Sequence, residues 1–407
     1  MISTAVKNSS EQIHTIYLLN NNFTYIPDDY FKSLHNLKHI WLEHNCIRNI
    51  SDSAFRGLES SLTFLDLSDN QLTTVPSALR VLNHLETLNL QQNPISSFDP
   101  YAFKGVSKSV LELSIDLGLF STWPEELSLL QNVSLIQLQE MNFSTVPDEA
   151  FSNWTQLHRF SLWGTRLEVI QRALCNVKST FDLYLFFNTA IQSGTNLFQT
   201  CNKSSSSQPF FNRVVLNGSN LKRISNIITS FPEMTYLAIT NNPLLGFISN
   251  EEVPDNSNLT ILVLRNNSFN RFPEALQNLP NLKYLDLSYN HIQSLQRHDL
   301  DGMTQLRSID LNNNPLQYVS GDAFNAAVLL SNIGFQSTNL TTIPQALSSA
   351  HSLRVIYFAE SPIECSCSML PWLDAWVQGL GNLYGNCENE NTHLSDFITK
   401  QLPNCTY

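Results

Sequence analysis

The chain has 407 residues, of which 14% are charged, and its formal net charge at pH 7 is −12. Nucleic acid is a poor partner for such a chain, because binding to phosphates needs clustered lysines and arginines. A membrane-spanning helix is also excluded from this sequence, since it contains no run of about eighteen apolar residues.

Residues 1–12 are expected to form an N-terminal tail. The start MISTAVKNSSEQIHTIYL lacks an uninterrupted apolar core and so does not resemble a secretory signal. Either the signal lies on an upstream segment or the protein stays inside the cell. No cysteine precedes the first repeat, which leaves its first strand as an open edge. That edge is able to pair with another chain, so a homodimer is one assembly to consider.

From Ile13 onward, a pattern close to L-x-x-L-x-L-x-x-N-x-L returns about fifteen times, with LTFLDLSDNQL at Leu62 and LKYLDLSYNHI at Leu282 among its clearest copies. The copies start at Ile13, Leu37, Leu62, Leu85, Val110, Val133, Leu157, Phe181, Phe211, Met234, Leu259, Leu282, Leu306, Leu330 and Leu353. Their spacing is roughly 23 to 25 residues, apart from a step of about 30 after Phe181. A fixed period of this length is typical of a leucine-rich-repeat solenoid.

Each copy alternates apolar and polar residues around positions 3 to 7, which predicts a short strand with one buried face. The rest of each repeat returns the chain to the next strand, so the strands are expected to stack in parallel and to stabilise one another. The predicted fold is an α/β solenoid, a leucine-rich-repeat horseshoe of about 15 repeats of ~24 residues with a parallel concave sheet. The solenoid is expected over residues 13–363, and a small disulfide-linked C-terminal cap over residues 364–407.

Asparagine is the usual residue at position 9, and its amide is expected to turn inward and satisfy backbone groups at the bend. This ladder is predicted at Asn21, Asn45, Asn70, Asn93, Asn242, Asn267, Asn290 and Asn314. In the middle of the chain the ladder residue is replaced by Gly118, Met141, Thr165, Thr189 and Ser219. The return segments contain prolines, as in STVPDEAF and NRFPEAL, which favours short helical turns or extended chain over long helices.

Positions 3, 5 and 7 of each strand are expected to face outward, where side chains are available to a ligand. In repeats seven to nine these positions carry large apolar residues with arginines beside them, the composition of an interface hot spot. The residues predicted to face outward there are Arg159, Trp163, Leu183, Leu185, Phe187, Arg213 and Val215. Tyr17, Trp41 and Phe64 form a second candidate on the first three strands. If the register slips in the irregular repeats, the residues of the middle group belong to the core instead.

No catalytic motif stands out, because the sequence lacks G-x-S-x-G, H-E-x-x-H, P-loop and EF-hand patterns. Asp286 and Asp310 occupy position 5 of neighbouring strands, so their carboxylates are expected to be close. Such a pair suits acid–base chemistry or a bound cation, although an exposed acidic ladder is the more common arrangement. The chain is predicted to be a non-enzyme without a metal or another cofactor.

After the last repeat the chain reads SPIECSCSMLPWLDAWV from Ser361, followed by Cys387 and Cys405. This arrangement resembles the C-terminal flanking cap of animal extracellular leucine-rich-repeat proteins. The resemblance implies the disulfides Cys365–Cys387 and Cys367–Cys405, whereas spacing alone permits three connectivities. A zinc site is the alternative, although C-x-C is not the usual C-x2-C knuckle. A disulfide-linked cap implies an oxidising compartment.

The remaining cysteines lie within the repeats. Cys175 and Cys201 occupy return segments of adjacent repeats and are expected near disulfide reach, with two unlinked buried thiols as the alternative. Cys46 is then left over, and we expect it to behave as a small, half-buried apolar residue.

The resemblance covers Ile13 to Cys405 and extends to the ectodomain class that includes Toll-like receptors and secreted matrix leucine-rich-repeat proteins. It implies an extracellular module, secreted or at the cell surface, that binds a protein, glycan or lipid in innate immunity, adhesion or signalling. The alternative is an intracellular scaffold or regulatory subunit with free thiols and no glycans. Sequons for N-glycosylation mildly favour export. They lie at Asn8, Asn22, Asn49, Asn132, Asn142, Asn153, Asn202, Asn217, Asn258, Asn266, Asn339 and Asn404.

Overall fold

The computed structural model describes residues 12–99, 101–166, 173–174, 177, 179, 181–188, 211–224, 226–367, 372–390 and 392–404. The chain divides into two compact units. We call them the N-terminal unit, which comprises Met1–Ile191 and Phe198–Phe211, and the C-terminal unit, which comprises Gln192–Leu197 and Asn212–Tyr407. No helix among the described residues is long and apolar enough to cross a membrane.

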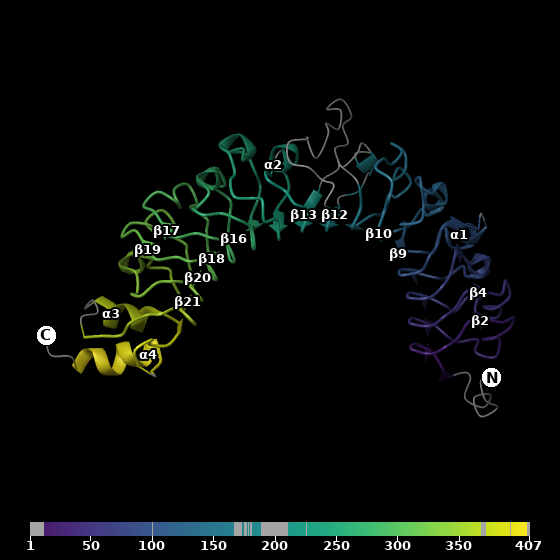
Figure 1. Ribbon diagram of the computed structural model, residues 1–407, viewed down its shortest axis with the longest axis horizontal. Helices are drawn as coiled ribbons and strands as arrows, with labels where there is room; N and C mark the ends of the chain where they lie inside the picture. Colours follow the sequence, from purple (N-terminus) through teal and green to yellow (C-terminus); the bar gives the residue numbers. More distant parts are fainter. Residues whose placement is uncertain are drawn as a thin grey trace. The chain divides into compact units, whose positions relative to one another are not determined.

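In the part of the chain that the structure describes, each of the fifteen repeats contributes one strand to a parallel sheet, and β22 from the C-terminal segment adds a sixteenth (Figure 1). The N-terminal unit contains β1 (Thr15–Tyr17), β3 (His39–Trp41), β5 (Phe64–Asp66), β7 (Thr87–Asn89), β9 (Glu112–Asp116), β10 (Leu135–Gln139), β11 (Arg159–Trp163) and β12 (Phe181–Phe186). From the boundary residue Phe211 onward follow β13 (Phe211–Asn217), β14 (Tyr236–Thr240), β15 (Ile261–Val263), β16 (Tyr284–Asp286), β18 (Ser308–Asp310), β20 (Asn332–Gly334), β21 (Val355–Tyr357) and β22 (Asn382–Tyr384). The predicted solenoid of parallel strands is confirmed.

The return segments form short pieces of structure on the side of each repeat away from these strands (Figure 1). Three parallel pairs occur there: β2 (Tyr25–Ile26) with β4 (Asn49–Ile50), β6 (Thr74–Val75) with β8 (Ser97–Phe98), and β17 (Ser294–Leu295) with β19 (Tyr318–Val319). The helical turns are α1 (Ala102–Val106), α2 (Ile227–Ser230), η3 (Ser77–Val81), η4 (Glu125–Leu129), η6 (Asn250–Glu252), η7 (Glu274–Asn278) and η8 (Gln345–Ser349).

Proline sets the start of four of these turns. Pro76, Pro124, Pro273 and Pro344 immediately precede η3, η4, η7 and η8, with φ between −76° and −63°. Proline fixes φ near this value and lacks an N–H, which the start of a helical turn does not need. The expectation of short helical turns in the return segments is therefore confirmed.

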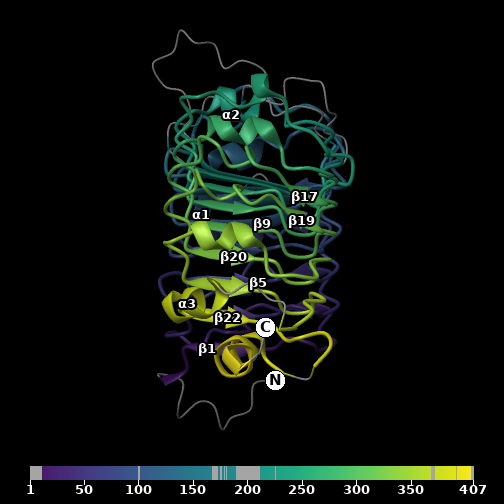
Figure 2. The same ribbon diagram turned by 90° about the vertical axis from the view of Figure 1, so that its left-hand side faces the viewer.

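The C-terminal end of the chain covers the last repeat. Here lie α3 (Trp372–Gly379), α4 (Leu394–Asp396), the single π-helical turn η9 (Phe397–Gln401) and η10 (Leu402–Asn404). Figure 2 shows α3 and β22 at this end of the chain, where α3 contacts η8 and η9, and α4 contacts β22. The predicted disulfide Cys365–Cys387 is present, with Cα atoms 5.4 Å apart, so these two sulfurs are not zinc ligands. Cys367 is also disulfide-bonded. Its predicted partner Cys405 lies outside the described residues.

The core between the strands and the return segments is filled by the apolar positions of the pattern, which are almost fully buried. The inward amides predicted at position 9 are confirmed from Asn45 onward, whereas Asn21 in the first repeat is exposed and bonds to the carbonyls of Leu18 and Leu19 in its own bend. The Asn290 amide donates to the carbonyls of Leu264 and Leu287, both at 2.9 Å, and its oxygen accepts the N–H of Phe269 at 3.1 Å. Each ladder asparagine of this kind joins its own bend to the neighbouring repeats.

The predicted register of repeat eight is wrong by one residue. Asn188, not Thr189, takes the ladder position: it is fully buried, donates to the Leu162 carbonyl at 3.1 Å and accepts the N–H of Thr165 at 3.0 Å. Since one step along a strand exchanges its two faces, Leu183 and Leu185 point into the core, and Tyr184 and Phe186 take the outward places.

Replacing a ladder asparagine should destabilise the fold strongly. Asn290→Ala leaves two buried carbonyls and one buried N–H with fewer partners, so we expect a loss of on the order of 2–4 kcal/mol in the free energy of unfolding. Urea unfolding measures it. Asn332→Ala, whose side chain is exposed on β20, should change stability little. Equal losses in the two variants would contradict the role given to the ladder.

Candidate binding surfaces on the strands

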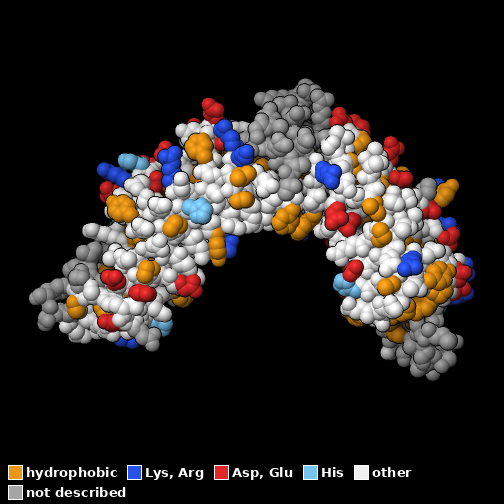
Figure 3. All heavy atoms as spheres, in the orientation of Figure 1, with side chains coloured by type: hydrophobic (Ala, Val, Ile, Leu, Met, Phe, Trp, Pro, Cys, Tyr) orange, Lys and Arg blue, Asp and Glu red, His pale blue; other side chains and the backbone are white. Residues whose placement is uncertain are grey.

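Four aromatic side chains and one arginine point outward at β11 and β12, the last described strands of the N-terminal unit. We call this group the aromatic surface: Arg159, Trp163, Tyr184, Phe186 and Phe187. Trp163 and Phe186 are paired residues on β11 and β12, and their ring centroids lie 4.1 Å apart. Tyr184 and Phe186 stack at 6.0 Å. The Arg159 guanidinium lies 5.3 Å from the centre of the Tyr184 ring, within cation–π range. Figure 3 shows hydrophobic side chains gathered on the strand side around β12.

Phe187 stands at the edge of the aromatic surface in an unfavourable backbone conformation. Its φ is +53°, its side chain is 54% exposed, and its ring lies 6.1 Å from that of Trp163. Glycine occupies the corresponding place in the preceding repeat, where Gly164 has φ +59°. A bulky side chain in the left-handed region costs roughly 1–2 kcal/mol relative to a favoured conformation. Phe187 therefore has an exposed ring at a position that glycine suits better.

The sequence-predicted binding residues divide into two groups. Trp163, Arg159 and Phe187 face outward as expected, and so do Arg213 and Val215 on β13. Leu185, with 1% exposure, and Leu183, with none, belong to the core, so their predicted outward orientation is wrong. Sequence reasoning missed Tyr184 and Phe186. The asparagine at 188 was the signal that would have found them, because aligning it with the ladder corrects the register of β12.

The second predicted surface is present on the first three strands. Trp41 contacts Phe64 with ring centroids 4.3 Å apart and stacks on Tyr17 at 6.1 Å. Tyr17 is 68% exposed, because β1 is the first strand of the sheet and has β3 on one side only. Trp41 and Phe64 are half-buried, so Tyr17 is the most exposed ring of this group.

The strand face of the C-terminal unit is aliphatic near its start. Register places Val215, Ala238 and Val263 in one row across β13, β14 and β15, with Tyr236 and Ile261 in the adjoining row. We call these five residues the aliphatic surface. Ala238 is only 3% exposed, so the accessible aliphatic side chains are those of Val215, Ile261 and Val263. The Arg213 guanidinium lies 4.4 Å from the centre of the Tyr236 ring and so remains at its margin. Polar residues fill the same positions in most other repeats, so this stretch is distinct.

Beside the aliphatic surface, Asp286 and Asp310 are paired on β16 and β18. Asp286 is only 6% exposed, so the expectation of an exposed acidic ladder is wrong at this position. Burial, with Asp286 as a smaller contribution, raises the pKa of Asp310 to about 6. Burial and the two carboxylates raise the pKa of Tyr284 to about 12, which keeps its hydroxyl protonated. The pair therefore forms a partly desolvated site of negative charge.

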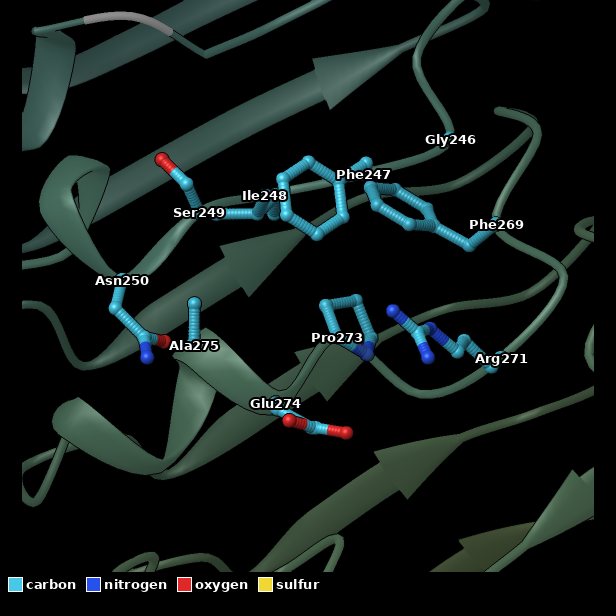
Figure 4. Close-up of a pocket in the computed structure, with 10 residues that line it drawn as sticks. All are labelled: Gly246, Phe247, Ile248, Ser249, Asn250, Phe269, Arg271, Pro273, Glu274 and Ala275. Carbon is cyan, nitrogen blue, oxygen red and sulfur yellow. The ribbon is translucent and has the colours of Figure 1, made fainter.

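A pocket in the return segments of the C-terminal unit is shown in Figure 4. It encloses about 130 Å³ between the loop at Gly246 and Phe247 and the segment from Phe269 to Ala275, with Arg271 and Glu274 on its margin. Small-molecule sites usually have volumes of roughly 300–1,000 Å³. The pocket is thus too small for an ordinary ligand, and the strand faces are the stronger candidates.

Some predicted sites lie outside the described residues, namely Cys175, Cys201, Asn8 and Asn202. Among the residues that are described, Cys46 has a free thiol and is half-buried, as expected, with its sulfur 3.3 Å from the Asn22 side-chain oxygen. The described part of the chain contains no group of three or more His, Cys, Asp or Glu side chains arranged to hold a metal ion.

Comparison with known protein families identifies the repeat. The profile described as leucine rich repeat matches residues 11–72, 232–292 and 257–316, that for two copies of the repeat matches residues 60–102, and the BspA-type leucine rich repeat region matches residues 85–205. The chain belongs to the leucine-rich-repeat proteins, a non-catalytic family of binding modules.

Similar proteins share only part of their length with this chain. The mouse high affinity nerve growth factor receptor is 32% identical over 88 residues, which is 22% of this chain and 11% of the receptor. Bovine leucine-rich repeat-containing protein 3B is 43% identical over 60 residues, 15% of this chain and 23% of that protein. Human lumican is 42% identical over 66 residues, 16% of this chain and 19% of lumican. The chain therefore spans less than a quarter of each.

Two solved structures share the fold over most of this chain. A leucine-rich-repeat protein of Leptospira interrogans superposes with a TM-score of 0.59 and 17% identity, covering 95% of this chain and 87% of that one. A chain of the Toll–Spatzle complex of Drosophila superposes with a TM-score of 0.57 and 18% identity, covering 89% and 46%. At such identities the likeness concerns the fold alone.

Asp310→Asn should stabilise the protein at neutral pH. The folded pKa of about 6 exceeds the ordinary 3.8, so between these pH values the folded state binds a proton that the unfolded state has lost. Stability therefore falls as the pH rises through this window. Asp310→Asn removes this pH dependence. Its free energy of unfolding at pH 7 should exceed that of the wild type by on the order of 1–2 kcal/mol, a figure reduced because solvent partly screens the carboxylate.

Urea unfolding at pH 4 and pH 7 measures the effect, with the exposed Asp255→Asn as control. An asparagine should fit at position 310. Asn89 occupies the same position of its own repeat, and its side-chain oxygen accepts the backbone N–H of Gln91, two residues later. A variant with the same stability difference between the two pH values as the wild type would disprove the assignment.

Proposed function

We propose that the chain is an extracellular recognition module that binds a protein partner through its strand faces. The observation that carries this proposal is the aromatic surface on β11 and β12, where stacked rings stand exposed beside Arg159. Aromatic and arginine side chains dominate the binding energy of protein interfaces, and loss of one such residue costs about 2 kcal/mol or more. Glycan and lipid ligands remain alternatives that the sequence suggested.

The cap supports the extracellular part of the proposal. The disulfide Cys365–Cys387 and the bonded Cys367 are typical of proteins from oxidising compartments. The predicted glycosylation sites also suit modification. The exposed ones are Asn22, Asn49, Asn132, Asn142, Asn153, Asn258, Asn266, Asn339 and Asn404, while Asn217 is half-buried. A place in a receptor or secreted protein of innate immunity, adhesion or signalling is proposed on this basis, with a homodimer as one assembly.

Secreted material should contain disulfides and glycans. Intact mass, measured with alkylation before and after reduction, is expected to show disulfide-bonded cysteines including Cys365, Cys367 and Cys387. Treatment with an amidase specific for N-glycans should lower the mass by whole glycan units. Seven alkylated cysteines before reduction together with an unmodified mass would instead indicate the intracellular scaffold.

Substitutions in the aromatic surface should weaken peptide binding without unfolding the protein. Asparagine tolerates positive φ better than phenylalanine, so Phe187→Asn is expected to raise the free energy of unfolding by about 0.5–1 kcal/mol while it removes an exposed ring. Trp163→Ala should cost about 1–3 kcal/mol, because it removes both the contact with Phe186 and the partial burial of the half-buried ring. Both variants should weaken binding of a peptide pool, selected on the wild type from a phage-displayed random dodecapeptide library, by tenfold or more.

Gln92→Asn is the matched control, since Gln92 occupies the same left-handed position with φ +55° and carries no ring. It should leave peptide binding unchanged. A strongly unfolded Trp163→Ala protein would place that residue in the core, and unchanged peptide binding in both aromatic variants would remove the aromatic surface as the docking site.

A further inference from the structure

The carboxylate pair of the C-terminal unit has a close counterpart in the N-terminal unit that differs in one respect. Asp66 and Asp286 occupy position 5 of their repeats and are almost fully buried, with 3% and 6% exposure. In both repeats one carboxylate oxygen, Oδ1, accepts the backbone N–H of the serine two residues later at 2.8 Å and its hydroxyl at 2.6 Å. This local geometry is the same at the two sites.

The difference lies in the paired residue on the next strand. Asp66 is paired with Asn89, whose amide donates to Asp66 Oδ2 at 3.0 Å. Asp286 is paired with Asp310, which has no such donor, and Asp310 accepts the N–H of Asn312 through its own Oδ1. Within the described part of the chain, the Oδ2 atoms of Asp286 and Asp310 receive no hydrogen bond. Two nearly adjacent carboxylates therefore each keep one acceptor without a donor.

The neighbouring arginines form no ion pair with the two carboxylates, although burial raises the pKa of Asp310 and the charge of Arg265, as the smallest contribution, lowers it. The Arg265 guanidinium lies 4.2 Å from the centre of the Tyr289 ring and 3.4 Å from the Ser288 hydroxyl. Arg213 is held over Tyr236 at the far margin of the aliphatic surface. Among the described residues, no cationic side chain forms an ion pair with Asp286 or Asp310. Both Oδ2 atoms are open to solvent. A cation supplied from outside can therefore reach these partly desolvated carboxylates and pair with them.

The aliphatic surface adjoins the pair directly. Val263 is paired with Asp286, and Ile261 with Tyr284, so apolar side chains of β15 lie one strand away from the carboxylates. A metal ion gains nothing from aliphatic neighbours and prefers six or more oxygen ligands when it is calcium. A peptide that carries both a basic and an apolar side chain matches both features.

We propose that Asp286 and Asp310 bind a lysine or arginine side chain of a partner protein, whose adjacent apolar residues pack on Ile261 and Val263. This inference rests on the proposed function and names the chemistry of its partner at one place on the strand face. The basic group donates to the two unsatisfied Oδ2 atoms, and the alkyl part of its side chain extends towards the valine and isoleucine. Binding is thus selective for a basic residue with apolar neighbours.

The test uses the full chain and a phage-displayed random dodecapeptide library, selected on the wild type and depleted on Asp286→Asn/Asp310→Asn. The peptides that remain are expected to share a lysine or arginine beside aliphatic residues. A synthetic peptide from this set should bind the double variant at least tenfold more weakly, and its lysine-to-norleucine version should lose a similar factor on the wild type. Val263→Thr, which keeps the side-chain shape, should weaken binding about threefold.

Asp66→Asn is the matched control, because it alters the same local geometry where the second oxygen already has a donor. It should leave peptide affinity unchanged, and thermal unfolding should show the double variant to be folded. Peptides without enrichment in lysine or arginine, or with equal affinity for the double variant, would overturn the inference. If their binding instead depends on Trp163, the proposed function stands without this site. If no peptide is enriched, the inference falls, and the mass measurement still decides the question of export.

Discussion

The structure depends on the side-chain amide at the bend of each repeat. A single repeat cannot bury its apolar face, so neighbouring repeats must stack on one another. Stacking buries the backbone groups at each bend, and these groups then need hydrogen-bond partners within the protein. Asn45, Asn70, Asn290 and Asn314 meet this demand in the same way, donating to their own bend and to the previous repeat. Their oxygens accept a backbone N–H that the return segment leaves free. The amide thereby fixes where each strand ends, and so which side chains reach the surface.

This constraint explains what the sequence was able to predict. The period, the parallel strands, the inward asparagines and the helical turns after proline all follow from patterns repeated many times. The predicted register of repeat eight was wrong because Tyr184 and Phe186 are large and apolar, like the leucines beside them. The spacing of apolar residues alone therefore allows two phases, in which one set or the other faces the core. Only the hydrogen-bonding need met by Asn188, which bonds to Thr165 and Leu162, distinguishes the two phases.

The candidate surfaces were predicted less well, since they depend on contacts between repeats about two dozen residues apart. The sequence shows aspartate at 66, 286 and 310, but not that Asn89 satisfies the first while the others face each other. Burial of Asp286 is equally hidden, because an aspartate at position 5 reads as an outward polar residue. The outward rings of β12 required the correct phase, and the apolar row formed by Val215, Ala238 and Val263 required the pairing of three strands.

The residue before each ladder position has a left-handed backbone conformation, and this affects how easily the residue can be replaced during evolution. Its backbone is held by the bend, while its side chain contributes little to the core, as the series Asp69, Gln92, Phe187, Tyr289 and Glu360 illustrates. Substitution there is limited mainly by the small local cost of positive φ, and not by the packing that restrains the leucines. During evolution, these positions can therefore acquire new side chains that contact a partner, one repeat at a time, with little effect on the stability of the solenoid.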